Sequence, residues 1–185
     1  MSNIPMIAME PLAAADFCAR YNANKEARAL LREGMMPPDF LAALMAHRQH
    51  VNAIEFLAHA LSTRAGIWWG CLCLQHACGA FLSPQDWDAL LAATVWVVWP
   101  TDAYRAAAQA PAQAAGTASA GGLLALAASV AGVSGPAPMS PALAVANAVK
   151  LATLKGDPAR IADTQRLYVE LGIGVAEGRF RWPVA

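Results

Sequence analysis

Proline and glycine divide this sequence into segments of helical length, and their spacing constrains the fold more than any other feature. Proline follows a helix-capping residue at Ser83-Pro84, Ser140-Pro141 and Asp157-Pro158, and glycine closes apolar stretches at Gly34 and Gly156. Proline suits the first turn of a helix and glycine suits its C-terminal end, so each such pair marks one helix. Because alanine, the best helix former, is abundant between these marks, the chain is predicted to be all-α.

The apolar periodicity within these segments predicts about nine helices. The clearest are expected over residues 25–33, 50–61, 63–81, 84–100, 122–133, 141–156 and 158–178. Helices joined by short links pack as antiparallel hairpins, which predicts a single compact bundle over residues 1–185, with some solenoid-like stacking. The remainder of the alanine-, glycine- and proline-rich stretch around 110–140 is predicted to form mobile loops.

Two of these helices differ in the distribution of their apolar residues. The helix over 50–61 is amphipathic, and its polar face is expected to carry Asn52, Glu55 and His59. Glu55 and His59 are four residues apart, which is typical of an ordinary surface pair. The helix over 63–81 is apolar nearly all round, so it is predicted to be the central and most buried helix.

Composition excludes several classes of function. Hydrophobic residues make up 57% of the chain, and 13 Lys and Arg balance 13 Asp and Glu. These values exclude a disordered chain and a basic nucleic-acid binder. No stretch reaches about 20 strongly apolar residues, the N-terminus lacks a signal-peptide pattern, and the 122–133 helix lacks the basic residues of a membrane-surface helix. We therefore expect a cytoplasmic protein without membrane insertion.

One cluster of residues suggests chemistry, namely Cys71, Cys73, His76 and Cys78. Zinc sites use Cys and His at short spacings, but Cys71 and Cys73 lie about 200° apart around a helix. Apolar surroundings also raise the pKa of a thiol and make it less reactive. We therefore expect core packing, with no catalytic residue, metal or cofactor. A metal- or small-molecule-binding protein or an enzyme that uses these four residues is the alternative.

The tryptophans point to a protein partner. There are six, more than one core of this size needs, and tryptophan dominates the energetics of protein interfaces. A charged fraction of only 14% also leaves apolar surface once one core is filled. The predicted partner contacts are Trp96, Trp99 and Trp182.

The stretch 58–73 reads AHALSTRAGIWWGCLC. It resembles the central signature of an uncharacterised, all-helical bacterial family, in which AHAL-x-x-R runs into WW-x-C-x-C. The matching residues are His59, Arg64, Trp68, Trp69, Cys71 and Cys73. The segments 96–107 and 167–172 also resemble that family, so the resemblance covers most of the chain.

Members of that family occur beside type VI secretion genes, especially those for spike and effector-loading proteins. The resemblance therefore implies an accessory role as an adaptor or chaperone, with a secretion spike component or an effector as partner. It carries over no catalytic residue. We expect the chain to be a non-enzymatic, protein-binding factor, which can also be a homo-oligomer. Arg64 is expected to anchor its helical hairpin through carbonyls at a helix end.

Overall fold

The computed structural model describes residues 8–9, 11–78, 82–133 and 138–183, and they form an all-α fold, as predicted. The helices are α1 (Ala14–Arg20), α2 (Lys25–Arg28), α3 (Pro37–Ala46), α4 (His50–Ala60), α5 (Thr63–Cys78), α6 (Pro84–Val98), α7 (Asp102–Ala107), α8 (Gln109–Ala115), α9 (Ala120–Ser129), α10 (Pro141–Thr153) and α11 (Ile161–Ala176), with a short 3-10 helix, η1 (Pro158–Arg160), before the last. In the described part of the chain, the only β pairing is an isolated bridge between Met9 and Leu61.

The predicted helix starts are confirmed by capping hydrogen bonds. The Ser83, Ser140 and Asp157 side chains each accept a hydrogen bond from a backbone N–H in the first turn that follows. Asn24 and Thr101 cap α2 and α7 in the same way. These side chains satisfy N–H groups that the helix itself leaves unpaired, which is why such short segments begin where they do.

Several helix boundaries differ from the prediction. The helix expected over 122–133 is α9, which ends at Ser129, and the helix expected over 141–156 ends at Thr153. The helix expected over 25–33 ends at Arg28, because the residues after it form tight i,i+3 turns instead of continuing the α-helix. Part of the stretch around 110–140 that was expected to be loop lies in α8, which begins at Gln109 and ends at Ala115. Proline is tolerated in the first turn of a helix, and the alanines around it favour the helical state. The end of the helix expected over 63–81 and the residues 134–137 lie outside the described residues.

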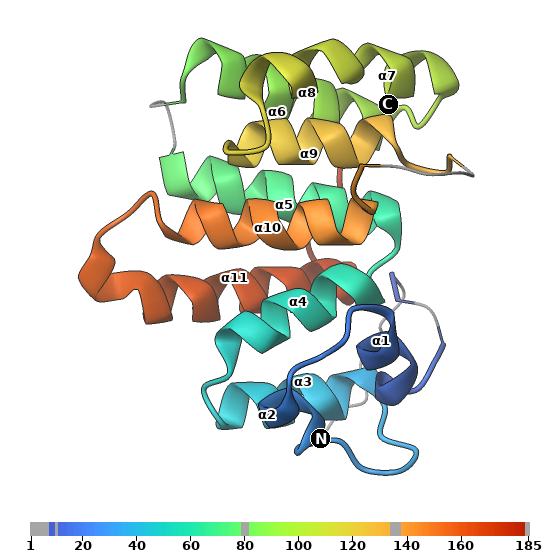
Figure 1. Ribbon diagram of the computed structural model, residues 1–185, viewed down its shortest axis with the longest axis vertical. Coiled ribbons are helices and arrows are strands. Elements are labelled where there is room, and N and C mark those ends of the chain that lie inside the picture. The colour runs from blue at the N-terminus through green and yellow to red at the C-terminus, as the bar shows by residue number, and fades with distance from the viewer. Residues whose placement is uncertain (1–7, 10, 79–81, 134–137, 184–185) are drawn as a thin grey trace.

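The helices stack in layers, with α5 in the middle (Figure 1). Helix α5 packs against α6 and α9 on one side and against α10 and α11 on the other. Helices α7 and α8 close one end of the stack, and α1, α2 and α3 close the other around α4 (Figure 1). The prediction that α5 is the central helix is confirmed by these contacts. The prediction that it is the most buried is wrong, since eight of its 16 residues are buried against eight of the 10 residues of α9.

Helix α11 approaches α5 and α4 closely at a glycine. A Cβ at Gly172 would lie 2.9 Å from Leu57 Cδ1 and 3.0 Å from Trp69 Cε2. The indole of Trp69 is fully buried and donates a hydrogen bond to the Tyr168 carbonyl at 2.8 Å. The absence of a side chain at Gly172 therefore permits this close contact between the helices.

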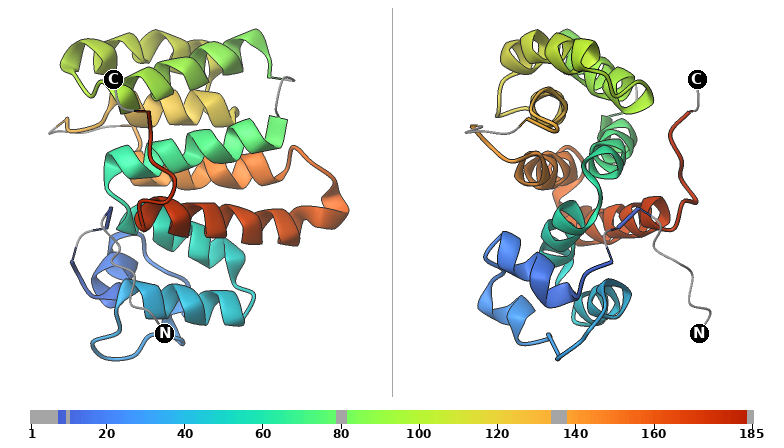
Figure 2. Two further views of the ribbon diagram at one scale, coloured as in Figure 1. Left: turned by 180° about the vertical axis from the view of Figure 1, so that it is seen from behind. Right: turned by 90° about the vertical axis from the view of Figure 1, so that its right-hand side faces the viewer.

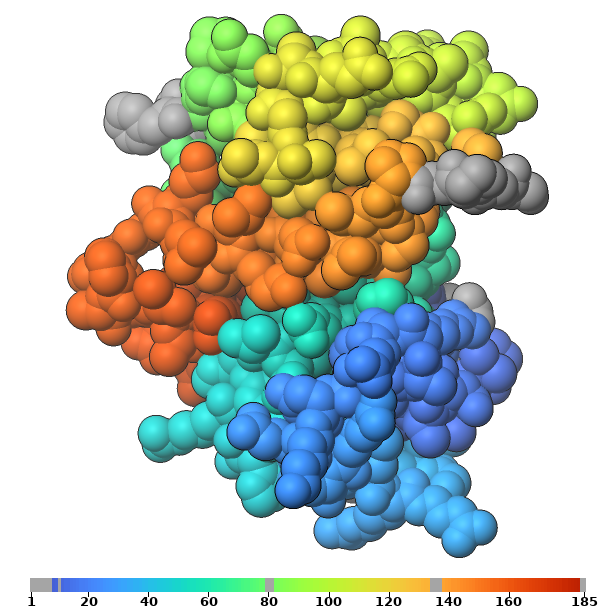
Figure 3. Space-filling model, viewed as in Figure 1, coloured from blue at the N-terminus to red at the C-terminus, as the bar shows by residue number. Residues whose placement is uncertain are grey.

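On the face shown in Figure 3, α10, α4 and the N-terminal helices adjoin one another. The segment after α11, residues 178–183, has no helical structure. It lies on the opposite side of the molecule from that face, the side of α6 (Figure 2). We call it the C-terminal strap. Its Phe180 ring fills the space where a Cβ at Gly174 would lie.

Candidate interaction surface

Helix α6 presents a row of apolar side chains to solvent. It turns its buried residues, among them Leu90 and Val97, toward α5, α8 and α9. Every fourth residue on its outer side, up to the C-cap Trp99, is apolar and at least partly exposed, and residues at this spacing form one ridge of a helix surface. We call this set the α6 ridge: Trp87, Leu91, Val95 and Trp99.

The exposure of this ridge is unusual for such large apolar side chains. Trp87 is 50% exposed, Leu91 52% and Trp99 45%, whereas Val95 is half-buried. Isolated exposed apolar residues are common on proteins, but four in one row form a contiguous patch. Contiguous apolar patches with tryptophan at both ends are typical of protein-binding surfaces.

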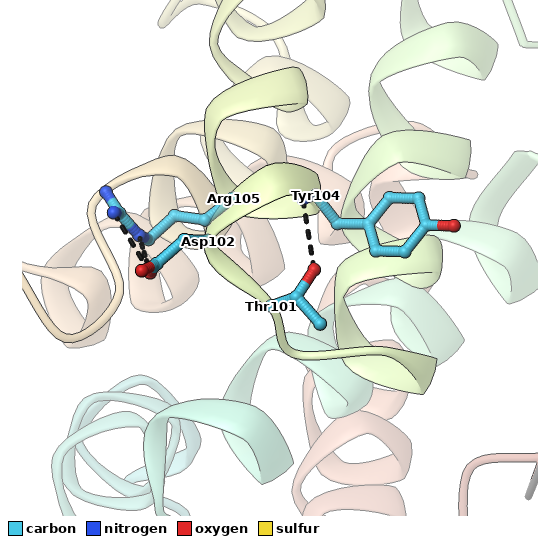
Figure 4. A network of polar contacts seen from close by, with 4 residues as sticks. All are labelled: Thr101, Asp102, Tyr104 and Arg105. Atoms are coloured by element: carbon cyan, nitrogen blue, oxygen red, sulfur yellow. Dashed lines mark hydrogen bonds and ion pairs between the residues drawn. The ribbon is translucent and has the colours of Figure 1, made fainter.

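Helix α7 extends the ridge beyond the end of α6. The Tyr104 ring lies beside Trp99, with 5.9 Å between ring centroids, and is 41% exposed. Thr101 caps α7 by accepting a hydrogen bond from the Tyr104 N–H, and Arg105 pairs with Asp102 at 3.1 Å (Figure 4). Figure 4 shows the ion pair and the Tyr104 ring on opposite sides of α7, so the ion pair does not cover the ring.

Arg64 ties α5 to the end of α6. Its Nε donates to the Val97 carbonyl at 2.6 Å and its Nη2 donates to the Val98 carbonyl at 3.1 Å. The last carbonyls of a helix have no partner within the helix and carry partial negative charge, so a guanidinium fork fits them well. The expectation that Arg64 anchors the hairpin through helix-end carbonyls is confirmed.

The C-terminal strap lies against the same end of α5. The Trp68 indole donates to the Phe180 carbonyl at 3.0 Å, and the Arg64 guanidinium sits over the Trp182 ring at 4.5 Å from its centroid. Phe180, Arg181 and Trp182 also line a largely apolar cavity of about 420 Å³. Trp182 is half-buried there and already contacts Arg64 of its own chain.

The three predicted contact residues therefore lie in different environments. Trp96 is only 8% exposed and packs in the core, so it offers little surface for contact with a partner. The reason is that α6 packs against neighbours on its inner side, and Trp96 lies on that side while Trp99 does not. Trp87 is the residue that sequence reasoning missed. Its signal was the four-residue spacing that joins it to Leu91, Val95 and Trp99.

The polar face predicted for the helix over 50–61 is only partly correct. Asn52 is buried at 7% exposure and donates to the Gln49 side chain at 2.9 Å. His59 stacks on Tyr21 at 4.8 Å, and burial lowers the pKa of His59. Glu55 pairs with Lys150 at 3.0 Å, which links α4 to α10. These contacts account for the polar residues of α4 as packing between helices.

The cysteines are distributed around α5 rather than gathered. Cys71 and Cys73 are buried, Cys78 is half-buried and His76 is exposed. Burial raises the pKa of Cys71 to about 12 and holds that of Cys73 well above its usual value. The expectation that apolar surroundings raise the pKa of these thiols is confirmed. Within the described residues, no three His, Cys, Asp or Glu side chains lie close enough together to hold one metal ion.

A labelling experiment tests the state of these thiols. With a pKa of about 12, only about one Cys71 side chain in ten thousand is a thiolate at pH 8. We expect iodoacetamide to alkylate Cys71 and Cys73 of the folded protein at least about 100-fold more slowly than those of the urea-unfolded protein. Peptide mass spectrometry at timed intervals measures both rates. Rapid labelling of either residue in the folded protein would instead identify an activated thiol and favour an enzyme.

Comparison with known proteins finds one family. A family model described as a family of unknown function (DUF6931) matches residues 40–176, which is more than half of the chain. The match runs from within α3 to the end of α11, so it includes the residues of the 58–73 signature and the α6 ridge but not the strap. No curated protein and no solved structure matches the chain. Across the described residues, no helix has both the length and the apolar character needed to cross a membrane.

Proposed function

We propose that this chain, which belongs to the DUF6931 family of unknown function, is a non-enzymatic protein-binding accessory factor that binds its partner through the α6 ridge. The observation that carries this proposal is the row of Trp87, Leu91, Val95 and Trp99 along the outer side of α6. An apolar i,i+4 row of this kind fits an amphipathic helix of a partner protein, whose own apolar side chains would pack between the ridge residues.

The chemistry of the buried residues supports a binding role over an enzymatic one. The raised pKa of Cys71 and Cys73 makes them poor nucleophiles, and His76 on the same helix is exposed to solvent. The polar groups of α4 pair with neighbouring helices and stabilise the fold. The finer role that we propose is an adaptor or chaperone in bacterial type VI secretion. It rests on the resemblance of the 58–73 signature, and its partner would be a spike component or an effector.

Pull-down of a tagged chain from its native host, read by mass spectrometry, tests the binding role. The wild-type chain is expected to retain a stoichiometric protein partner, and the double variant Trp87→Ala/Leu91→Ala is expected to lose it. Leu154→Ala is the matched control, because Leu154 is 62% exposed but lies at the end of α10, away from the ridge. Trp99→Ala is expected to weaken the complex with little change in the thermal midpoint.

Two results would contradict the proposal. One is equal capture of the partner by the wild type and by the ridge double variant, with both chains folded to the same thermal midpoint. The other is the absence of any stoichiometric partner. A spike component or effector among the captured proteins would support the secretion role. A partner from another system would contradict that role and leave the binding role intact.

A further inference from the structure

We propose that the C-terminal strap regulates the α6 ridge. When the strap is docked on α5, it places Trp182 on the guanidinium of Arg64, and the same guanidinium holds the last carbonyls of α6. When the strap undocks, the last turn of α6 opens more often and displaces Trp99, which is one end of the ridge. The consequence for binding, a higher affinity of the ridge while the strap is docked, rests on the proposed function.

The strap is held on the protein by few contacts. Beyond Phe180, no strap residue forms a backbone–backbone hydrogen bond with another described residue. The Trp68 indole donates to the Phe180 carbonyl at 3.0 Å, and Trp182 meets Arg64 (Figure 2). The cavity of about 420 Å³ lies behind these contacts, so the strap is not densely packed against the helices. A segment held in this way opens locally while the rest of the chain stays folded, which gives the strap a docked and an undocked state.

Arg64 is shared between the strap and the end of α6. Its Nε and Nη2 donate to the Val97 and Val98 carbonyls, at 2.6 Å and 3.1 Å. At the same time its guanidinium carbon lies 4.5 Å from the centroid of the Trp182 ring. The ring attracts the charge and restricts the guanidinium to the position from which its planar fork reaches both carbonyls. Docking of the strap and pairing of the α6 carbonyls therefore stabilise each other.

The last turn of α6 depends on this pairing. Pro100 has no N–H, and the Thr101 N–H bonds to the Trp99 carbonyl, so neither residue extends the hydrogen-bond ladder of α6. Within the turn, the Trp99 N–H donates to the Val95 carbonyl at 2.9 Å. Weaker pairing by Arg64 lets this turn fray, and fraying moves Trp99 away from Val95 and shortens the apolar row. One side chain thus couples the strap to the ridge.

The family comparison favours a modulating role for the strap. The DUF6931 model ends at residue 176, where α11 also ends, and the strap begins at Gly178. The family model therefore covers α5, α6 and the ridge without the strap. Coupling between two sites is reciprocal, so a partner that holds Trp99 in place also tightens the docking of the strap, by the same factor.

Hydrogen exchange of the full-length chain, resolved at single amides, tests the coupling. Trp182→Ala is expected to speed exchange of the Trp99 N–H about two- to fivefold, the effect of losing one cation–π contact at a partly exposed site. Amides in the middle of α6 are expected to keep their wild-type rates. Arg181→Ala is the matched control, because Arg181 is exposed in the same strap and donates to the Gly178 carbonyl, away from Arg64. Far-UV circular dichroism shows whether each variant is folded.

A second variant detaches the strap without changing Arg64 or Trp182. The three atoms nearest to a Cβ at Gly174 all belong to the strap, so Gly174→Leu is expected to push the Phe180 ring out of its place. Leucine favours a helix more than glycine does, which keeps α11 formed. The Trp99 N–H is expected to exchange faster in this variant as well.

A double-mutant cycle shows whether the strap acts through Arg64. In an Arg64→Ala background the fork is already absent, so adding Trp182→Ala is expected to leave the exchange rate of the Trp99 N–H unchanged. A full additional effect of Trp182→Ala in that background would overturn the proposal. So would wild-type exchange at Trp99 in both Trp182→Ala and Gly174→Leu.

The binding consequence is measured with the host protein that the wild-type chain captures, after that protein is purified. Its dissociation constant for Trp182→Ala is expected to be about two- to fivefold higher than for the wild type. Equal dissociation constants would overturn the strap as a regulator of ridge binding. If the wild type captures no host protein, the proposed function fails, and the exchange rates of the Trp99 N–H still decide whether the strap holds the end of α6.

Discussion

Replacing Trp69 with alanine is expected to lower the free energy of unfolding by about 3–5 kcal/mol. The Trp69 side chain is fully buried at the junction of α5 and α11, and its indole N–H donates to the Tyr168 carbonyl at 2.8 Å. Removal leaves a large cavity in the central layer of the stack, where neighbours on both sides limit collapse. Urea denaturation followed by circular dichroism measures the change. A loss below about 1 kcal/mol would show that α11 packs on α5 without this anchor.

A double-mutant cycle with Gly172 tests the geometry of that contact. Gly172→Ala alone is expected to cost about 1–3 kcal/mol, because its Cβ would lie 3.0 Å from both Trp69 Cε2 and Nε1. In a Trp69→Phe background those two atoms are absent, so the cost of Gly172→Ala is expected to fall by about 1 kcal/mol. Gly156→Ala is the control, since nothing lies within 4 Å of its Cβ. Strict additivity would show that Trp69 does not limit the space at Gly172.

The fold was predictable because it depends on local rules. Capping residues followed by proline, as at Ser83 and Ser140, determine where a helix starts through bonds within one turn. The wrong predictions concern residues whose environment is set by packing between helices and not by the local sequence. Pro111 looked like a loop residue, yet it sits in the first turn of α8, which packs on α9. Asn52 fell on the polar face of α4, yet packing buries it.

The candidate surface was only partly predictable for a related reason. Periodicity shows which residues share a face of α6, but it does not show which face meets the neighbouring helices. Trp96 and Trp99 are one helical turn apart, and only the packing of α5, α8 and α9 makes one buried and the other exposed. The role of Arg64 could be predicted more easily, because a guanidinium at the start of one helix of an antiparallel hairpin lies beside the C-terminal end of the next helix.

Replacing Arg64 with alanine is expected to lower the free energy of unfolding by about 2–3 kcal/mol. The change removes two hydrogen bonds from a charged donor and leaves the Val97 and Val98 carbonyls without that partner. It also removes the cation–π contact with Trp182, which is worth about 0.5–1 kcal/mol at a partly exposed site. Urea denaturation measures the loss, and hydrogen exchange is expected to be faster in the last turn of α6.

Arg64→Lys distinguishes charge from geometry. A lysine keeps the positive charge near the C-terminus of α6, but it lacks the planar fork that reaches two carbonyls at once. If the fork is what stabilises the hairpin, lysine recovers less than half of the loss caused by alanine. Full recovery would show that charge beside the helix end is sufficient. Because the last turn of α6 supports Trp99, the fork also holds the end of the α6 ridge in place, and Arg64→Ala is expected to weaken ridge-dependent binding as well as folding.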